Sequence, residues 1–285
     1  MEKKEYVLKE KANGEKITVR DVQNVLLEMI QDIDEICRKN NIEYVLTGGS
    51  TLGAIKFGGF IPWDDDLDIA MMRDQYEKFI KVLKKELPDK YVFHCFEVNK
   101  KYNVAWPAMK IRKKGTYIKE ANTLLPNKCD DCDGIFIDVF IYDYLSNWTI
   151  IDLPFRLFNT ILMPIIVFFE NLNINSILFK RIYRGNAILY GKLNRGSNYI
   201  GDEITWTFRS PLHPLKYRRK KMFPIKYVKF ENIMLPVQND AHEYLVRRYG
   251  ANYMDPLPEH KMKPKHIVDI SLTTDKPEEE QADGK

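Results

Sequence analysis

Hydrophobic residues in the first third of the chain recur at helical spacing in two stretches. The first runs from Val22 to Cys37, and Thr18 with Asp21 three residues later makes a weak form of the capping box that opens a helix. The second covers residues 74–87 and is ended by Pro88, which cannot continue a helix. Two amphipathic helices, each with one buried stripe, are therefore predicted here.

Between and after these helices, short apolar runs have the character of strands. The first leads through Gly48-Gly49-Ser50 into a brief helix that ends near Phe57. Strands that alternate with helices favour an α/β or α+β domain. The predicted strands cover residues 42–47, 69–72, 91–96, 104–111 and 135–142.

From Trp148 onwards the pattern changes to large apolar side chains. They dominate residues 150–169, and residues 176–193 predict a basic amphipathic helix. Because the longest uncharged run, 157–169, contains Pro164 and falls short of the roughly 20 apolar residues of a membrane span, no spanning helix is expected. A helical subdomain and a segment lying in the membrane surface both stay open. The cations that would suit either lipid headgroups or a solvated face are Lys180, Arg181, Arg184, Lys192 and Arg195.

These changes of character divide the chain into four parts. They are a catalytic core over residues 1–147, the apolar and basic helical insertion over 148–210, a C-terminal part over 211–275, and a polar, acidic tail over 276–285 that we expect to be disordered. Residues 210–230 hold cations and no acid, which suits a solvated loop or a landing site for a polyanionic or lipid-phosphate acceptor. These cations are Lys216, Arg218, Arg219, Lys220, Lys221, Lys226 and Lys229.

Composition excludes several classes of protein. A chain of 285 residues with 45% hydrophobic and 29% charged residues is globular rather than disordered or fibrous. Its formal net charge of +4 is too mild to predict nucleic-acid binding. Four cysteines do not suggest a secreted disulfide framework, and the charged N-terminal segment shows no secretory signal. The expected location is the cytoplasm, at the inner face of the cell membrane.

An acidic run, Asp64-Asp65-Asp66-Leu67-Asp68, precedes the apolar strand at 69–72. Asp66 and Asp68 are two residues apart, so on a strand they project to the same side. Two adjacent carboxylates repel each other unless a cation lies between them, and Mg²⁺ is bound by such carboxylates together with substrate phosphates. A solvated capping loop is the alternative, but apolar segments flank the run and favour a metal site.

Two further features lie close to this run in the sequence. The turn Gly48-Gly49-Ser50 between a strand and a helix can expose backbone N–H groups to a phosphate, although such a turn is a weak signal alone. Asp138 is the one acid in the apolar strand 135–141, where it could be a satisfied core acid or a ligand of the same ion. Beside the first pair it becomes the expected third ligand.

These features together resemble the nucleotidyltransferase fold, and longer stretches resemble the LicD family of phosphocholine transferases. That family also includes the fukutin-related sugar-phosphate transferases. Leu46–Phe79, with its core WDDDLD, carries the closest resemblance, and residues 134–145 and 230–266 resemble further segments of the family. The resemblance implies a mixed β-sheet core flanked by helices, with an inserted apolar and basic helical subdomain.

Membership of that family implies a metal-dependent transferase. It would move phosphocholine, or a related phospho-alcohol, from a CDP-activated donor to a hydroxyl of a cell-envelope glycan, a teichoic acid or a lipid-linked precursor, and release CMP. CDP-choline is the favoured donor, and no nucleic acid is expected. Mg²⁺ or Mn²⁺ would be held by Asp66, Asp68 and Asp138, with Asp64 in support, and Asp138 would complete the site or accept the acceptor's proton.

Other residues would act on the donor's phosphates. Gly48, Gly49 and Ser50 would cradle a phosphate, and Lys110 and Arg112 could offset charge on the departing CMP, although both could equally end a solvated strand. The runner-up function is a nucleotidyltransferase that uses CTP or another NTP and releases pyrophosphate. A non-catalytic binding protein with the same fold is a third hypothesis. The presence of all four acids, Asp64, Asp66, Asp68 and Asp138, argues against it.

A structural zinc site is a further alternative. Cys129 and Cys132 form a CxxC pair, and His94 and Cys95 lie on an earlier strand. Such residues can bind Zn²⁺. The second CxxC that would strengthen the case is absent, so reduced thiols in a surface loop are favoured.

Overall fold

The computed structural model describes residues 5–104, 107–121, 129, 132–204 and 214–273. At its centre, β4 (Asp68–Met72) and β8 (Phe136–Leu145) run parallel in a mixed sheet. The other edge of β8 is shared, with β6 against its first half and β9 against its second half, both antiparallel. The remaining sheet is built from β3 (Val45–Leu46) on β4, β5 (Tyr91–Cys95) on β6 (Met109–Lys113), and β10 (Tyr217–Arg218) on β9 (Tyr199–Asp202).

The alternation of side chains along β4 and β8 separates two cores. Ile69 and Met71 pack with Val139 and with the apolar stripes of α1 (Val19–Lys39) and α3 (Arg73–Glu86). Ala70 and Phe140 point to the opposite face, in a second core that also receives residues of α2 (Gly48–Phe57) and α7 (Ala241–Tyr249). Asp68 and Asp138 share the parity of Ala70 and Phe140, so both acids project toward α2 and α7.

Local sequence signals explain where α1 begins. The Thr18 hydroxyl accepts the N–H of Asp21, and the Asp21 carboxylate accepts the N–H of Thr18, which completes the capping box. The predicted helices over the first third of the chain are thus confirmed, as is the short helix ending at Phe57. The predicted strand over 104–111 was wrong at its start, because β6 begins at Met109.

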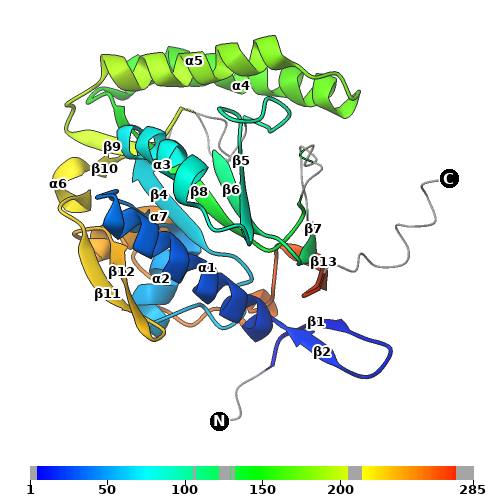
Figure 1. Ribbon diagram of the computed structural model, residues 1–285. Helices are drawn as coiled ribbons and strands as arrows, with labels where there is room; N and C mark the ends of the chain where they lie inside the picture. Colours follow the sequence, from blue (N-terminus) through cyan, green and yellow to red (C-terminus); the bar gives the residue numbers. More distant parts are fainter. Residues whose placement is uncertain (1–4, 105–106, 122–128, 130–131, 205–213, 274–285) are drawn as a thin grey trace.

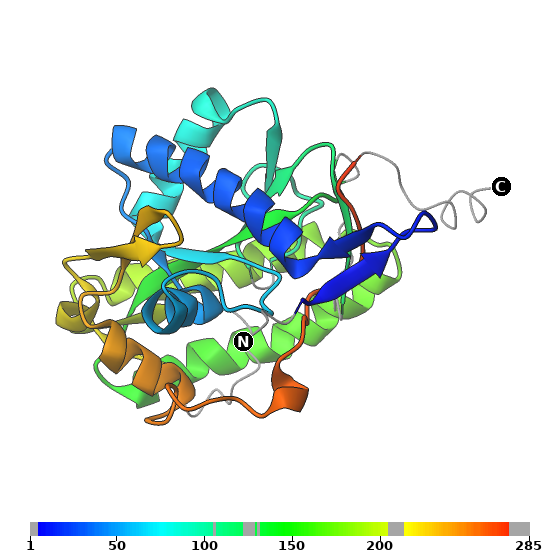
Figure 2. The same cartoon turned by 90° about the horizontal axis from the view of Figure 1, so that it is seen from below.

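Three two-stranded sheets lie around this body. The hairpin β1–β2 projects beside the start of α1 (Figures 1 and 2), and β13, near the C-terminus, pairs with β7. A short helix, α6 (Arg219–Met222), and a 3-10 turn (Glu259–Lys261) complete the described elements. The three small sheets are β1 (Val7–Glu10) with β2 (Lys16–Thr18), β11 (Lys226–Phe230) with β12 (Ile233–Val237), and β7 (Tyr117–Glu120) with β13 (Ile267–Ser271).

The apolar and basic region forms two helices, α4 (Thr149–Asn171) and α5 (Ile177–Leu193). They lie side by side as an outer layer against the sheet body (Figures 1 and 2). The sequence-based expectation that this region is too short to span a membrane was wrong, because α4 continues through Pro154 and Pro164 for 23 residues. By length and composition alone it could cross a membrane, and 33% of its most apolar window is buried.

The charges of this region differ most from expectation. Lys180 is 0% exposed and pairs with Glu170, and Arg184 is 5% exposed and pairs with Glu97 and Glu203. Neither cation is solvated or free for lipid headgroups. The basic stretch at 210–230 is also partly neutralised, since Lys216 pairs with Asp152 and Lys221 with Asp240 and Glu243. Residues 276–285 and 210–213 lie outside the described part of the chain.

Candidate active site

The central strands bring the predicted acids together. In the parallel pairing of β4 with β8, Asp68 lies opposite Asp138, and in the antiparallel pairing of β6 with β8, Lys110 lies opposite the same Asp138. All three side chains project to the face of the sheet that α2 and α7 cover. Residues 28 to 70 positions apart in the sequence thus meet in one row across three strands.

The start of α2 is packed directly against this row. A Cβ on Gly48, whose φ is +56°, would lie 3.1 Å from Asp68 Oδ2, and one on Gly49 would lie 2.7 Å from Asp64 Oδ2. Glycine at both positions therefore allows the acids to approach the helix. The Ser50 hydroxyl accepts the backbone N–H of Asp68 at 2.8 Å, which fixes the beginning of β4 on α2.

Two tyrosines hold the turn before α2. The Thr47 hydroxyl lies 2.7 Å from the hydroxyls of both Tyr142 and Tyr244, and the Gly48 N–H donates to the Tyr244 hydroxyl at 2.8 Å. The Gly48 N–H predicted to cradle a phosphate is therefore engaged by α7. Gly49 and Ser50 lie at the acids, as the sequence pattern suggested.

The acidic run itself divides between two tasks. Asp65 is 4% exposed, and its carboxylate accepts the backbone N–H groups of Lys265, His266 and Ile267. Asp66 instead faces the site, where His266 Nε2 lies 3.1 Å from its Oδ2. Ligand atoms of Asp64, Asp65 and His266 lie within 4.8 Å of one another. Since three backbone N–H groups donate to Asp65, its role is to dock the start of β13. His266 joins the predicted acids at the site, although it was not assigned there from the sequence.

The carboxylates of the site disfavour one another's ionisation. Burial, followed by repulsion from Asp66, Asp138 and Asp64, raises the pKa of Asp68 well above its ordinary value. Burial and the neighbouring Asp66 and Asp65 do the same to the pKa of Asp64. Burial also raises the pKa of Asp138 to about 6, although Lys110 opposes the change. A divalent cation bound among these oxygens would relieve the repulsion, and hard carboxylate oxygens are the ligands that Mg²⁺ and Mn²⁺ prefer.

The two cations predicted on β6 have different surroundings. Lys110 Nζ lies 3.1 Å from Asp138 Oδ1 and 2.9 Å from Glu120 Oε2, so it is part of the site. Arg112 is 2% exposed, and its guanidinium donates to Glu120 and to the carbonyl of Gly134. It holds Glu120 in place behind Lys110 rather than facing a donor.

Arg248 on α7 was not identified from the sequence. Its guanidinium lies close to Gly48, its charge lowers the pKa of Asp68, and it pairs with Asp202 at 3.9 Å. The signal that could have found it is the adjacent pair Arg247-Arg248 within the stretch 230–266, which resembles the family. Only the fold shows which of these two arginines faces the acids.

The four residues considered for zinc do not gather in the described structure. His94 and Cys95 are neighbours on β5 and so point to opposite faces of the sheet. Burial raises the pKa of the Cys95 thiol to about 12, which keeps it protonated. Cys129 is buried and accepts from Asn99 Nδ2 at 3.4 Å, and Cys132 contacts the carbonyl of Lys113. Within the described ranges, these four form no cluster with metal-ligand spacing.

This chain is similar in sequence to several known proteins. The lipopolysaccharide cholinephosphotransferase LicD of Haemophilus influenzae is 27% identical over 282 residues, which cover 90% of this chain and 99% of that protein. An uncharacterized protein of Rickettsia typhi is 41% identical over 58 residues, covering 20% of this chain and 19% of its own. One of Rickettsia prowazekii is 32% identical over 88 residues, covering 24% and 33%.

A comparison with protein families locates the match more narrowly. Residues 41–128 match the family described as LicD/FKTN/FKRP, nucleotidyltransferase domain. This range contains the Gly48-Gly49-Ser50 turn, the acidic run and Lys110. The chain therefore carries a LicD/FKTN/FKRP nucleotidyltransferase domain and is a homologue of LicD along most of its length.

Proposed function

We propose that this protein transfers phosphocholine from CDP-choline to a hydroxyl of a cell-envelope glycan and releases CMP. The observation that carries the proposal is the pair Asp68 and Asp138, in register on parallel strands and facing the start of α2. The similarity to a lipopolysaccharide cholinephosphotransferase favours choline as the transferred alcohol and a lipopolysaccharide as the acceptor. Teichoic acid and lipid-linked precursors belong to the same chemical class of acceptor.

Asp66, Asp68 and Asp138 would hold Mg²⁺ or Mn²⁺, with Asp64 in support. The fit rests on the crowding of their carboxylates, whose pKa values burial raises. When bound, the ion would neutralise charge on the donor's diphosphate. This is the main requirement of phosphoryl transfer, in which catalysis consists mostly of positioning and charge neutralisation.

The residues of the chain supply the rest of the reaction. The acceptor oxygen attacks the β-phosphorus, the bond from that phosphorus to the CMP oxygen breaks, and the proton of the acceptor hydroxyl passes to Asp138. Lys110, beside Asp138, and Arg248, beside Gly48, place positive charge where the departing CMP gains negative charge. His266 orients Asp66 through its Nε2 contact.

The test is CMP release by the purified protein with Mg²⁺ and a lipopolysaccharide acceptor. CDP-choline, CDP-ethanolamine, CDP-ribitol and CDP-glycerol are compared as donors. We expect release from CDP-choline, reduced about 100-fold or more in Asp68→Asn, because the variant lacks a carboxylate that would hold the charge-neutralising metal ion. Asp74→Asn, an exposed carboxylate on α3, is the matched control and should keep full activity.

Two results would reject the proposal. A folded Asp68→Asn protein with normal turnover would remove the metal assignment. Pyrophosphate release from CTP, with no CMP from any CDP-alcohol, would establish the alternative nucleotidyltransferase. Release from a donor other than CDP-choline would keep the reaction and replace the alcohol.

A further inference from the structure

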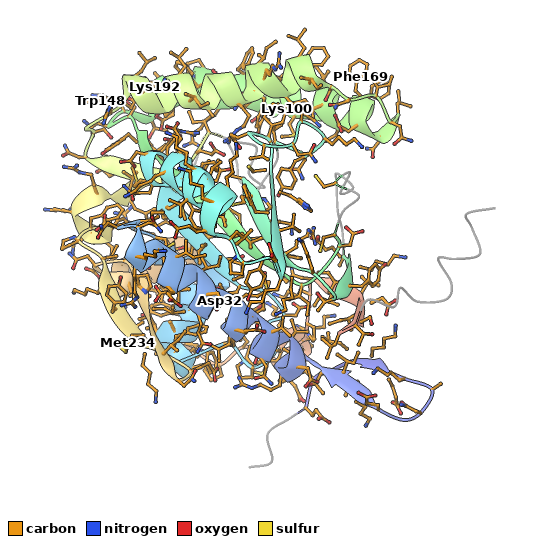
Figure 3. The ribbon with its side chains drawn as sticks, viewed as in Figure 1. Asp32, Lys100, Trp148, Phe169, Lys192 and Met234 are labelled. Atoms are coloured by element: carbon orange, nitrogen blue, oxygen red, sulfur yellow. The ribbon has the colours of Figure 1, made fainter. Side chains whose placement is uncertain are left out.

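The outer face of the α4–α5 layer is apolar along its length. Figure 3 places Trp148 and Phe169 near opposite ends of this layer. Its large exposed side chains recur at helical spacing, three or four residues apart or about two turns apart, which makes one stripe on each helix. They are Trp148, Ile150, Ile151, Leu157, Phe158, Ile161, Ile165, Phe168 and Leu172 on and beside α4, and Ile174, Leu178, Ile182, Leu189 and Leu193 on and beside α5.

The charges of the same helices point inward. A surface helix of a water-soluble protein buries its apolar stripe and exposes its charges. Here the arrangement is reversed, because Asp152 pairs with Lys216 and Glu170 pairs with Lys180 beneath the layer. The buried charged residues of the two helices are Asp152, Arg156, Glu170, Lys180 and Arg184.

The few exposed charges of the layer have one sign. Residues 147–198 are all described, and both acids in this range, Asp152 and Glu170, are buried. The exposed charges are Arg181, Lys192 and Arg195. A contiguous apolar surface with a basic rim is complementary to a lipid leaflet that contains anionic headgroups.

We propose that the outer face of α4 and α5 is a membrane-docking surface that lies in the plane of an anionic leaflet. A second copy of the chain fits this face less well, because two such layers would bring their basic rims together. A spanning role for α4 would require it to leave the sheet body, to which the Asp152–Lys216 ion pair and the Asn159 side chain, which donates to the carbonyl of Ile204, both tie it. The proposal does not rest on the reaction proposed above.

The experiment is flotation of the full chain with vesicles, without donor, metal or acceptor. Equimolar phosphatidylcholine and phosphatidylglycerol are compared with phosphatidylcholine alone. The variant is Ile161→Glu with Phe168→Glu, at positions that are 67% and 61% exposed, so the fold in water should be unaffected. Met254→Glu with Leu257→Glu, exposed apolar residues outside the layer, is the matched control.

We expect the wild type and the control to float with the anionic vesicles and the variant to bind about tenfold more weakly or worse, since two apolar side chains no longer enter the lipid. Replacing Arg181, Lys192 and Arg195 with Gln should remove the preference for anionic vesicles. Carbonate at high pH should extract the bound protein.

Three results would overturn the proposal. In the first, the variant floats as well as the wild type. In the second, the protein resists carbonate extraction, which would indicate a spanning helix. In the third, the wild type stays free of vesicles and sediments as a dimer that Ile161→Glu with Phe168→Glu dissociates, which would assign the face to a second copy.

Discussion

Gly49 illustrates how a single residue is set by its neighbour across the site. Alanine is the better helix former by about 1 kcal/mol, so Gly49→Ala should not weaken α2 itself. Its Cβ, however, would lie 2.7 Å from Asp64 Oδ2, and that carboxylate must move. We expect CMP release to fall about tenfold or more while the melting temperature is kept, because displacement of one group of a phosphoryl-transfer site is costly.

The matched control is Gly185→Ala in α5, where a Cβ would meet nothing within 4 Å. This variant should gain about 0.5–1 kcal/mol of stability from helix propensity and keep full turnover. If Gly49→Ala behaved as Gly185→Ala does, the approach of Asp64 to the helix would have no part in activity.

At the scale of the element, the segment from Asp64 to Asp68 contains acids with opposite effects on stability. In Asp65→Asn, one of the two carboxylate oxygens that accept three backbone N–H groups becomes an amide N–H₂, which cannot accept them. We therefore expect the free energy of unfolding to fall by about 1–3 kcal/mol and hydrogen exchange in β13 to become faster. Asp68→Asn removes repulsion from Asp66 and Asp138, so its stability should stay the same or rise.

Urea unfolding of the two variants beside the wild type measures both effects. Asp65→Asn should also lower activity indirectly, because the start of β13 carries His266 toward Asp66. Equal stability of the Asp65→Asn protein and the wild type would show that the three hydrogen bonds contribute nothing to the docking of β13.

This division also shows how far the sequence could predict the site. Helix α1, the turn before α2 and the pair Asp66 and Asp68 follow from spacing within one segment, which periodicity and alternation describe well. The role of Asp65 depends on backbone groups some 200 positions away, and nothing local distinguishes it from its neighbours. Arg248 reaches the acids for the same long-range reason, through the packing of α7 on α2.

The prediction for the helical layer of α4 and α5 was wrong for a different reason. A pattern of apolar and charged residues locates a helix and its two faces, but not which face is turned to the protein. Lys180 looked like a solvated or lipid-facing cation, yet it is buried because Glu170, ten residues earlier and across the α4–α5 connection, provides an ion-pair partner. The usual inference is that the apolar face of a helix is buried and its charged face is exposed. Here the charges are buried in pairs, so the inference gives the wrong face.

At the scale of the whole molecule, buried ion pairs hold this layer to the sheet. Arg184 of α5 pairs with Glu203, which follows β9, and with Glu97, which follows β5, and Arg73 of α3 also pairs with Glu203. Arg184→Met should therefore cost stability at the low end of about 3–5 kcal/mol, since Arg73 still faces Glu203. Arg181→Met, on the outer face of the same helix, should change stability by less than about 0.5 kcal/mol.

The same pair predicts how stability depends on pH. Burial opposes ionisation of Glu97, but the charge and hydrogen bond of Arg184 outweigh it and hold the pKa of Glu97 below its ordinary value. A carboxylate with a lowered folded-state pKa stabilises the protein above its unfolded pKa of about 4.3, and this contribution is lost as pH falls through the folded-state value. Urea midpoints measured at about pH 7 and about pH 3 should thus fall less with acid in Arg184→Met than in the wild type. An equal fall in both proteins would mean that the link between α5 and the sheet does not depend on this ion pair.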